Sequence, residues 1–79
     1  MMRTYTYSVV EQQCCSGELG AYRTYGIQVA GRMPNGWEIV EVIHDIVFSR
    51  EAAELMAALF TRYQLSPIHF RDVVEDMLP

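Results

Sequence analysis

The sequence predicts an α+β fold, in which an antiparallel meander of three strands is followed by a C-terminal helical hairpin packed on one sheet face. Two observations predict this fold. Up to about residue 48, apolar and polar residues alternate with the period of two that is typical of strands. From residue 49 onwards, apolar residues recur every three or four positions, as in helices. The chain has 79 residues, so we expect one domain over residues 1–79.

The first strand is expected over residues 3–11. Within it, Tyr5, Tyr7 and Val9 alternate with threonine and serine, which is a pattern rich in β-forming residues. The segment that follows, QQCCSGELG, contains two glycines and is expected to form a loop.

The second strand is expected over residues 21–30. Gly26 within it indicates a bulge or the close approach of a neighbouring backbone, because glycine otherwise weakens a strand. The segment GRMPNG then predicts a turn. Pro34 restricts the backbone there, and the Asn35–Gly36 pair favours a tight reversal.

The third strand is expected over residues 37–48. This segment is long for a single strand, so it either bends near His44 or breaks into two strands, which would make four in all. Its apolar residues fall on both faces, which indicates that both faces are covered. We expect the helices on one face and a second subunit on the other.

The first helix is expected over residues 50–64. Ser49 is the expected N-cap, and Glu51 favours the positive end of the helix dipole. The apolar residues at helical spacing form the expected buried stripe, which consists of Ala52, Leu55, Met56, Leu59 and Tyr63, with Phe60 beside them.

The second helix is expected over residues 67–78. Ser66 is the expected N-cap, and Pro67 stands at the first helical position, where a missing N–H has no consequence. Leu65 and Phe70 have the spacing of a hydrophobic staple across this helix start. The expected inner stripe consists of Phe70, Val73, Val74, Met77 and Leu78.

Two strings of the sequence, YRTYGIQVAG and HDIVFSREAAELMAALFTRYQLSPIHFRDVVEDML, resemble a family of short clostridial proteins that is known only as a domain of unknown function. The likeness is best at YGI, residues 25–27, and in the ending, which contains Leu65-Ser66-Pro67, His69, Asp72, Glu75 and Asp76. It covers about half to two-thirds of the chain. The resemblance implies a small standalone bacterial domain, and it carries no activity, cofactor or catalytic residue.

The composition argues against nucleic-acid and membrane binding. All six basic residues are arginines spread along the chain, and ten acids give a net charge of −4. An acidic chain repels a phosphate backbone. No apolar run approaches the ~20 residues of a membrane helix, and the first residues lack the apolar core of a signal peptide. We therefore expect a cytoplasmic protein.

Four residues of the second helix form the candidate interaction or ligand face: His69, Asp72, Glu75 and Asp76. His69, Asp72 and Asp76 have the spacing of one helix side, so a histidine and two carboxylates could bind a metal ion there. The alternative is a solvated helix surface. Glu75 and Asp76 lie in the last turn, where the helix dipole disfavours negative charge. Arg71 can pair with Glu75, and an arginine elsewhere, a partner protein or water could compensate the rest.

The cysteines and histidines make a poor metal site. Cys14 and Cys15 are adjacent, whereas structural zinc sites separate their cysteines by two to four residues, so joining them to His44 and His69 is unfavourable. No Gly-x-Ser-x-Gly motif and no phosphate-binding glycine loop occurs in the sequence. The sequence therefore predicts no metal, no cofactor and no catalytic residue.

These observations favour a small intracellular protein-interaction or regulatory module without catalysis, whose protein partner the sequence does not identify. The alternative is a small-ligand or metal-binding protein that uses the histidine and acids of the second helix. An enzyme ranks third. Three strands leave open edges and an uncovered face, so we also expect a homodimer through the sheet.

Overall fold

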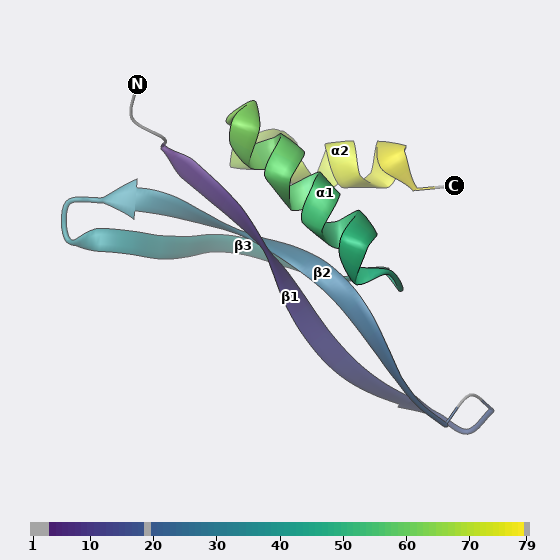
Figure 1. Ribbon diagram of the computed structural model, residues 1–79. Helices are drawn as coiled ribbons and strands as arrows, with labels where there is room; N and C mark the ends of the chain where they lie inside the picture. Colours follow the sequence, from purple (N-terminus) through teal and green to yellow (C-terminus); the bar gives the residue numbers. More distant parts are fainter. Residues whose placement is uncertain (1–3, 19, 79) are drawn as a thin grey trace.

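The computed structural model describes residues 4–18 and 20–78 and confirms the predicted α+β fold. The strands form an antiparallel sheet in the order β1-β2-β3. The elements are, in chain order, β1 (Tyr5–Ser16), β2 (Gly20–Met33), β3 (Gly36–Val47), α1 (Arg50–Arg62) and α2 (Pro67–Met77). Both helices lie on the same face of the sheet (Figure 1). Arg3, where the first strand was expected to begin, and Pro79 lie outside the described residues.

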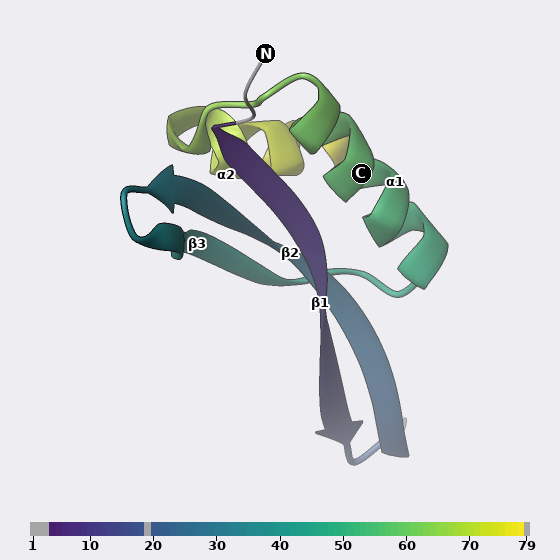
Figure 2. The same ribbon diagram turned by 60° about the vertical axis from the view of Figure 1, so that its left-hand side comes forward.

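The hairpin of β1 and β2 is longer than the sequence predicts. β1 continues through residues 12–16, where we expected a loop, and β2 continues three residues past Ala30. Pairing is unbroken from Tyr5 opposite Gly31 to the end of β1. This ladder of hydrogen bonds supplies partners for the backbone of the polar segment 12–16. The stabilisation from this pairing outweighs the weak preference of these residues for strand structure. The far end of the hairpin therefore extends beyond both helices (Figure 2).

β3 is one strand rather than two, and its pairing with β2 contains two irregularities. One of them lies opposite Gly26 and includes Asp45, whose φ is 59°. The β3 backbone approaches Gly26 so closely that a Cβ atom would overlap the Ile43 carbonyl oxygen and lie 2.8 Å from the Cα of His44. The prediction of a bulge or a close approach at Gly26 is therefore confirmed on both counts.

The core lies between the sheet and the two helices. Three aromatic rings meet there edge to face, with centroids 5.4 Å apart for Tyr7 and Phe60, 5.1 Å for Tyr7 and Phe70, and 6.0 Å for Phe60 and Phe70. Each such pair contributes about 0.5–1.5 kcal/mol beyond its burial. The other buried apolar residues are Ile27, Val29, Ile46, Ala53, Met56, Ala57 and Val74. The aromatic contacts join β1, α1 and α2.

The side of α1 that faces the sheet agrees only in part with its apolar spacing, because Met56 and Phe60 are buried as predicted but three other members of the predicted stripe are not. Its buried residues are Ala53, Met56, Ala57, Phe60 and Thr61. Leu55, Leu59 and Tyr63, which belong to the expected buried stripe, are instead exposed. Ala53 and Ala57 allow the helix backbone to come close to the sheet, and close packing along this side stabilises the helix more than burial of the leucines would.

Both helices begin at the predicted caps. Ser49 Oγ accepts a hydrogen bond from the Ala52 N–H at 3.3 Å. Ser66 occupies the N-cap of α2 without a side-chain hydrogen bond, and Pro67 follows it at the first helical position. Of the helices in the part of the chain that the structure describes, none is both long and apolar enough to cross a membrane.

The buried stripe of α2 is shorter than predicted. Phe70 and Val74 are buried and Val73 is half-buried, as expected. Met77 and Leu78, the last two members of the expected stripe, are 48% and 37% exposed. They lie at the end of the helix, where neither the sheet nor α1 covers them (Figure 1).

Side chains at the end of α1 close the outer edge of β1. Gln64 Oε1 accepts a hydrogen bond from the Tyr5 N–H at 2.9 Å, and Gln64 Nε2 donates to the Tyr5 carbonyl at 2.9 Å. Thr61 Oγ1 accepts from the Tyr7 N–H at 2.9 Å and donates to the Tyr7 carbonyl at 3.2 Å. The two side chains thus satisfy the same backbone groups that a neighbouring strand would pair.

Gln64 makes these bonds from a left-handed backbone conformation, with φ of 50°. It follows the C-cap of α1 in a Schellman motif, in which the Leu65 N–H donates to the Phe60 carbonyl at 3.0 Å and the Gln64 N–H donates to the Thr61 carbonyl at 3.1 Å. Glycine is the usual residue at this position, because a side chain there costs about 1 kcal/mol. The hydrogen bonds to β1 offset that cost.

We expect Gly26→Ala to lower the free energy of unfolding by about 1–3 kcal/mol, because the new methyl group meets backbone atoms of β3 that cannot move without breaking the pairing. Urea denaturation followed by circular dichroism measures the effect. Gly17→Ala is the matched control, since a Cβ there meets nothing within 4 Å. An equal effect of both substitutions would contradict this account of Gly26.

Gln64→Ala should lower the free energy of unfolding by about 1–3 kcal/mol, because it removes the side-chain bonds to Tyr5 while a Cβ remains in the left-handed conformation. Gln64→Gly removes the same bonds and relieves the backbone strain, so it should be less destabilising by about 1 kcal/mol. Urea denaturation of both variants separates the two contributions. A Gln64→Gly variant that is about 1 kcal/mol more stable than the wild type would show that the bonds to β1 contribute nothing.

Candidate functional site

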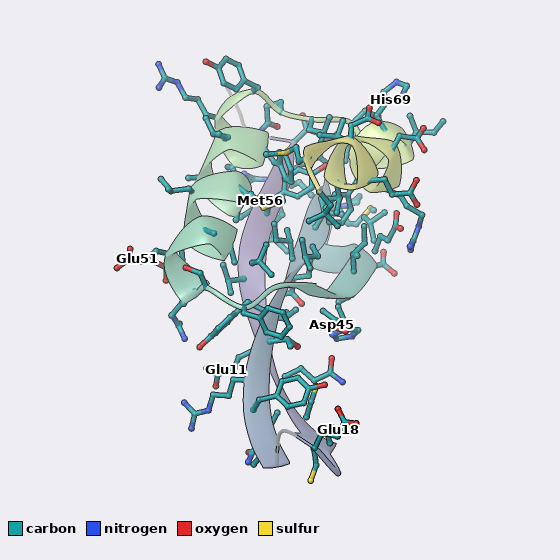
Figure 3. All side chains as sticks on the ribbon, turned by 90° about the vertical axis from the view of Figure 1, so that its right-hand side faces the viewer. Glu11, Glu18, Asp45, Glu51, Met56 and His69 are labelled. Carbon is teal, nitrogen blue, oxygen red and sulfur yellow. The ribbon has the colours of Figure 1, made fainter. Side chains whose placement is uncertain are left out.

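The four residues of the candidate face on α2 are exposed and do not converge on one point. Figure 3 shows His69 on the outer side of α2, away from the sheet. At the helical repeat, His69 and Asp76 share one side but lie about 10 Å apart along the axis, and Glu75 lies about 120° around the helix from His69. Within residues 4–18 and 20–78, the side chains of these three residues and of Asp72 make no hydrogen bond or ion pair.

Arg71 pairs with a residue of the sheet. Its Nη2 lies 2.9 Å from Oε2 of Glu41 on β3, whereas the sequence suggested Glu75 as its partner. The bond ties α2 to β3, although an ion pair with this much exposure contributes only about 0–1 kcal/mol. Within the described part of the chain, Glu75 and Asp76 therefore keep their unfavourable charges at the helix end without a compensating arginine.

The cysteines also lie differently from the prediction. Cys14 and Cys15 belong to β1 rather than to a loop, and adjacent residues of a strand point to opposite faces. Cys14 Sγ lies 3.8 Å from Oγ1 of the buried Thr24, whereas Cys15 is exposed. Over residues 4–18 and 20–78, no group of three histidine, cysteine, aspartate or glutamate residues is placed to hold a metal ion.

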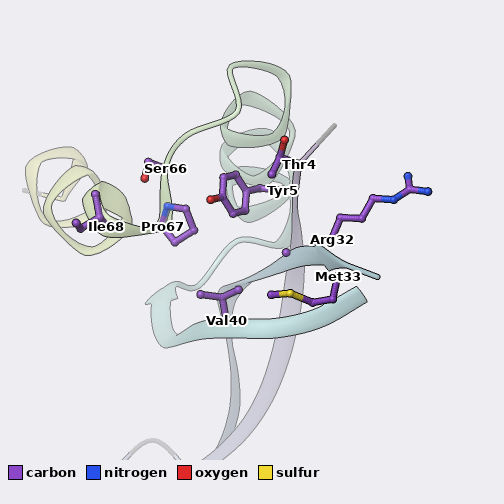
Figure 4. A pocket seen from close by; sticks show the side chains of 9 residues that line it. Thr4, Tyr5, Arg32, Met33, Val40, Ser66, Pro67 and Ile68 are labelled. Atoms are coloured by element: carbon purple, nitrogen blue, oxygen red, sulfur yellow. The ribbon is translucent and has the colours of Figure 1, made fainter. Parts of the chain in front are cut away.

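A pocket of about 370 Å³ lies between the end of the β2–β3 hairpin and the start of α2. Figure 4 shows its mainly apolar lining by Tyr5, Met33, Val40 and Pro67, with the Arg32 side chain extending away from it. Such a lining suits an apolar side chain better than a phosphate or a metal ion. Sequence reasoning missed this pocket because four distant segments form it, and no local pattern marks such a combination.

The face of the sheet that the helices leave uncovered is exposed to solvent. Strand pairing sets Trp37 opposite Arg32 and Ile39 opposite Ala30, and paired residues share a face. Trp37 is 50% exposed and Ile39 is 51% exposed. The Arg32 guanidinium carbon lies 5.9 Å from the centre of the Trp37 ring, within range of a cation–π contact. This group, together with Val42 opposite Gln28, is called the sheet face below.

Both edges of the sheet carry features that oppose pairing with another strand. Thr61 and Gln64 close β1 along its first residues. β3 carries two pairing irregularities and the acids Glu38 and Glu41, and both bulges and charges oppose edge-to-edge pairing. A protein that binds the sheet would therefore contact its face rather than extend it.

The electrostatics of the core are dominated by Tyr7. Burial, followed by the charges of the neighbouring Tyr5 and Glu41, raises the pKa of Tyr7 to about 12. The Tyr7 hydroxyl donates a hydrogen bond to the Leu65 carbonyl at 2.6 Å. Tyr7 thus stays protonated at neutral pH and serves as a structural donor.

The pKa of Tyr22 is also raised, chiefly because the Cys14 thiol, when ionised, places a negative charge beside it. The Tyr22 ring lies 6.2 Å from that of Phe48. Raised pKa values move both Tyr7 and Tyr22 further from neutrality, so neither hydroxyl is suited to act as a general base near pH 7.

These features define a small α+β domain with helices on one face of a three-stranded sheet and an exposed aromatic surface on the other. The sequence matches, over residues 2–79, a family described as "Family of unknown function (DUF6514)". The chain belongs to this family, which confirms the predicted membership of a domain-of-unknown-function family. No curated protein and no solved structure matches the chain.

We expect the free energy of unfolding to fall between pH 10 and pH 12. The folded-state pKa of Tyr7 is about 12 and the usual value is 10.0, so the stabilisation is complete below pH 10 and is lost as the pH rises through 12. The loss is at most about 2–3 kcal/mol. Urea denaturation across this range measures it.

Tyr7→Phe should remove the part of the alkaline loss that Tyr7 causes, at the expense of the hydrogen bond to Leu65. Tyr63→Phe is the control, because Tyr63 is 72% exposed and its change should leave the pH dependence as it is. A Tyr7→Phe variant with an unchanged loss between pH 10 and pH 12 would refute the assignment.

Proposed function

We propose that this protein is a small, non-catalytic protein-interaction module that binds its partner through the sheet face. The observation that carries the proposal is Trp37, which is 50% exposed on a face that neither helix covers and has the Arg32 guanidinium over its ring. Exposed aromatic residues on a partly apolar surface are typical of protein-binding sites.

The chemistry of the sheet face supports a protein partner. Tryptophan and arginine are the residues most enriched among those that dominate binding energy, and Ile39 enlarges the apolar area beside them. Trp37 and Arg32 also lose little freedom on binding, because each already restrains the other. A partner that suits this face presents apolar side chains around a carboxylate that can pair with Arg32.

The homodimer through the sheet stays a prediction, and a second copy bound in that way would compete with the proposed partner for the sheet face. We also propose a cytoplasmic location, which is supported by the free thiols of Cys14 and Cys15.

A clostridial source is supported by the resemblance of the ending, residues 65–78, to short clostridial proteins.

The proposal is tested by isolating the bound protein from the source bacterium with the tagged chain and then measuring its affinity by calorimetry. We expect Trp37→Ala to weaken binding at least tenfold, because truncation of a tryptophan that a partner buries typically costs about 2 kcal/mol or more. Trp37 is the only tryptophan of the chain, so its emission should also shift to shorter wavelength when the partner covers it.

Ile68→Ala is the matched control for this measurement. Ile68 is 80% exposed but lies on α2, on the other side of the sheet, so its truncation should change the affinity less than twofold. The proposal fails if Trp37→Ala binds as well as the wild type, or if the emission of Trp37 does not change on binding. Circular dichroism of each variant confirms that it is folded.

A further inference from the structure

We propose that the solvent-facing side of α1 binds the same side of α1 in a second copy of the chain, as an antiparallel pair about a two-fold axis. The contact surface consists of Glu51, Leu55, Ala58 and Arg62, which we call the α1 seam. It lies on a different element from the sheet face, so this inference is independent of the function proposed above.

The α1 seam has the residue spacing of a helix–helix contact. Its members are separated by four, three and four residues, which places them in one line along the helix. The line lies opposite the buried residues of α1, and Figure 3 shows Glu51 on the outer side while Met56 faces the sheet. Leu55 is 67% exposed, and Leu59 beside it is 45% exposed. Exposed leucines on the outer side of a helix are not needed for the fold of one chain.

The α1 seam is complementary to itself about one point. Glu51 and Arg62 have their midpoint between Met56 and Ala57, and Leu55 and Ala58 have the same midpoint. A two-fold axis through that point therefore sets Glu51 beside the partner's Arg62 and Leu55 against the partner's Ala58. A large residue against a small one lets two helices approach closely.

The charges of α1 divide into paired and unpaired ones. Arg50 Nε lies 3.1 Å from Oε1 of Glu54, and its Nη1 lies 3.6 Å from Oε1 of Glu11. Within residues 4–18 and 20–78, Glu51 and Arg62 have no ion-pair partner, and the Arg62 guanidinium carbon lies 5.7 Å from the centre of the Tyr63 ring. These two lie 11 positions apart, about 16 Å along the axis, at opposite ends of the α1 seam. The antiparallel arrangement supplies each with a partner of opposite sign.

A hollow on the surface of α1 matches the same arrangement. It has a volume of about 330 Å³ and is lined by Glu51, Glu54 and Leu55. The two-fold axis places the partner's Leu59 opposite Glu54 and the partner's Arg62 opposite Glu51. The hollow would thus receive an apolar side chain against Leu55 and a cation between two acids.

The sheet face lacks this self-complementarity. Its charged residue is Arg32, and the neighbouring positions on that face, Ala30, Trp37 and Ile39, carry no acid. A second copy placed there would leave both arginines without a carboxylate. The second copy therefore fits α1, and the sheet face fits a protein of different sequence.

The expected dimer is weak. α1 has 13 residues, and a contact over so short a helix buries less than the ~800 Å² per partner of a standard interface. We expect a dissociation constant in roughly the micromolar range, and a weaker dimer at high salt because the two ion pairs are exposed.

Sedimentation equilibrium of the purified chain over a wide concentration range, at low salt, tests the proposal. The wild type should move from monomer to dimer mass, and Leu55→Glu should stay monomeric because each copy then sets a carboxylate against the partner's Ala58. Glu51→Arg alone and Arg62→Glu alone should each weaken the dimer about tenfold, because two attractive pairs become repulsive.

Mixing the two charge variants gives the sharpest result. In an equal mixture of Glu51→Arg and Arg62→Glu, each copy offers the charge that the other needs at both ends, so dimers should form with about the wild-type affinity. An antiparallel two-fold contact predicts both the weakening of each variant alone and the rescue in the mixture, whereas a parallel contact would leave each variant alone no weaker than the wild type. Circular dichroism of each variant checks that α1 is intact.

Three results would overturn the proposal: a wild type that stays monomeric at every concentration, a dimer that survives Leu55→Glu, or a mixture that associates no better than its components. Trp37→Glu separates the alternatives. If that substitution on the sheet face abolishes the dimer while Leu55→Glu does not, the second copy binds the sheet instead.

Discussion

The structure depends on hydrogen bonds from two side chains, Thr61 and Gln64, which stand where a further strand would lie beside β1. They satisfy the donor and acceptor of Tyr5 and of Tyr7, so the sheet can end at β1 without an open edge there. The same bonds fix the end of α1 against β1. They also bring the Leu65 carbonyl to the Tyr7 hydroxyl, and the chain enters α2 from that point.

This arrangement decides which surfaces remain for other molecules. Because β1 and both helices are joined on one side, the other side of the sheet is left to solvent (Figures 1 and 2). The strand pairing places Trp37 and Arg32 on that side. The close approach of α1 through its alanines turns Leu55 outward as well. The two exposed surfaces differ in symmetry. The α1 seam matches itself, and the sheet face requires something unlike itself.

The strand and helix order, both N-caps and the special role of Gly26 could be predicted from the sequence, because each depends on residues near one another in the chain. The buried side of α1 could be predicted from the sequence only in part. Apolar periodicity favours large residues such as Leu59 as the buried ones, whereas Ala53 and Ala57 are the residues that pack closely on the sheet. Residues 12–16 were misjudged as a loop since their strand structure comes from β2. For the candidate site, the sequence predicted only that the acidic side of α2 is exposed. The sheet face depends on pairing Trp37 with Arg32, which requires the register.

The closure of β1 by α1 also has a consequence for synthesis of the chain. Tyr5 and Gln64 are separated by 59 positions, so β1 leaves the ribosome long before the side chain that completes it. Until then, one edge of the growing hairpin presents free N–H and C=O groups to other nascent chains. Folding can therefore begin with the sheet, but it is completed only after the connection between the helices has been translated. Chains that end before residue 64 should be the most prone to aggregate.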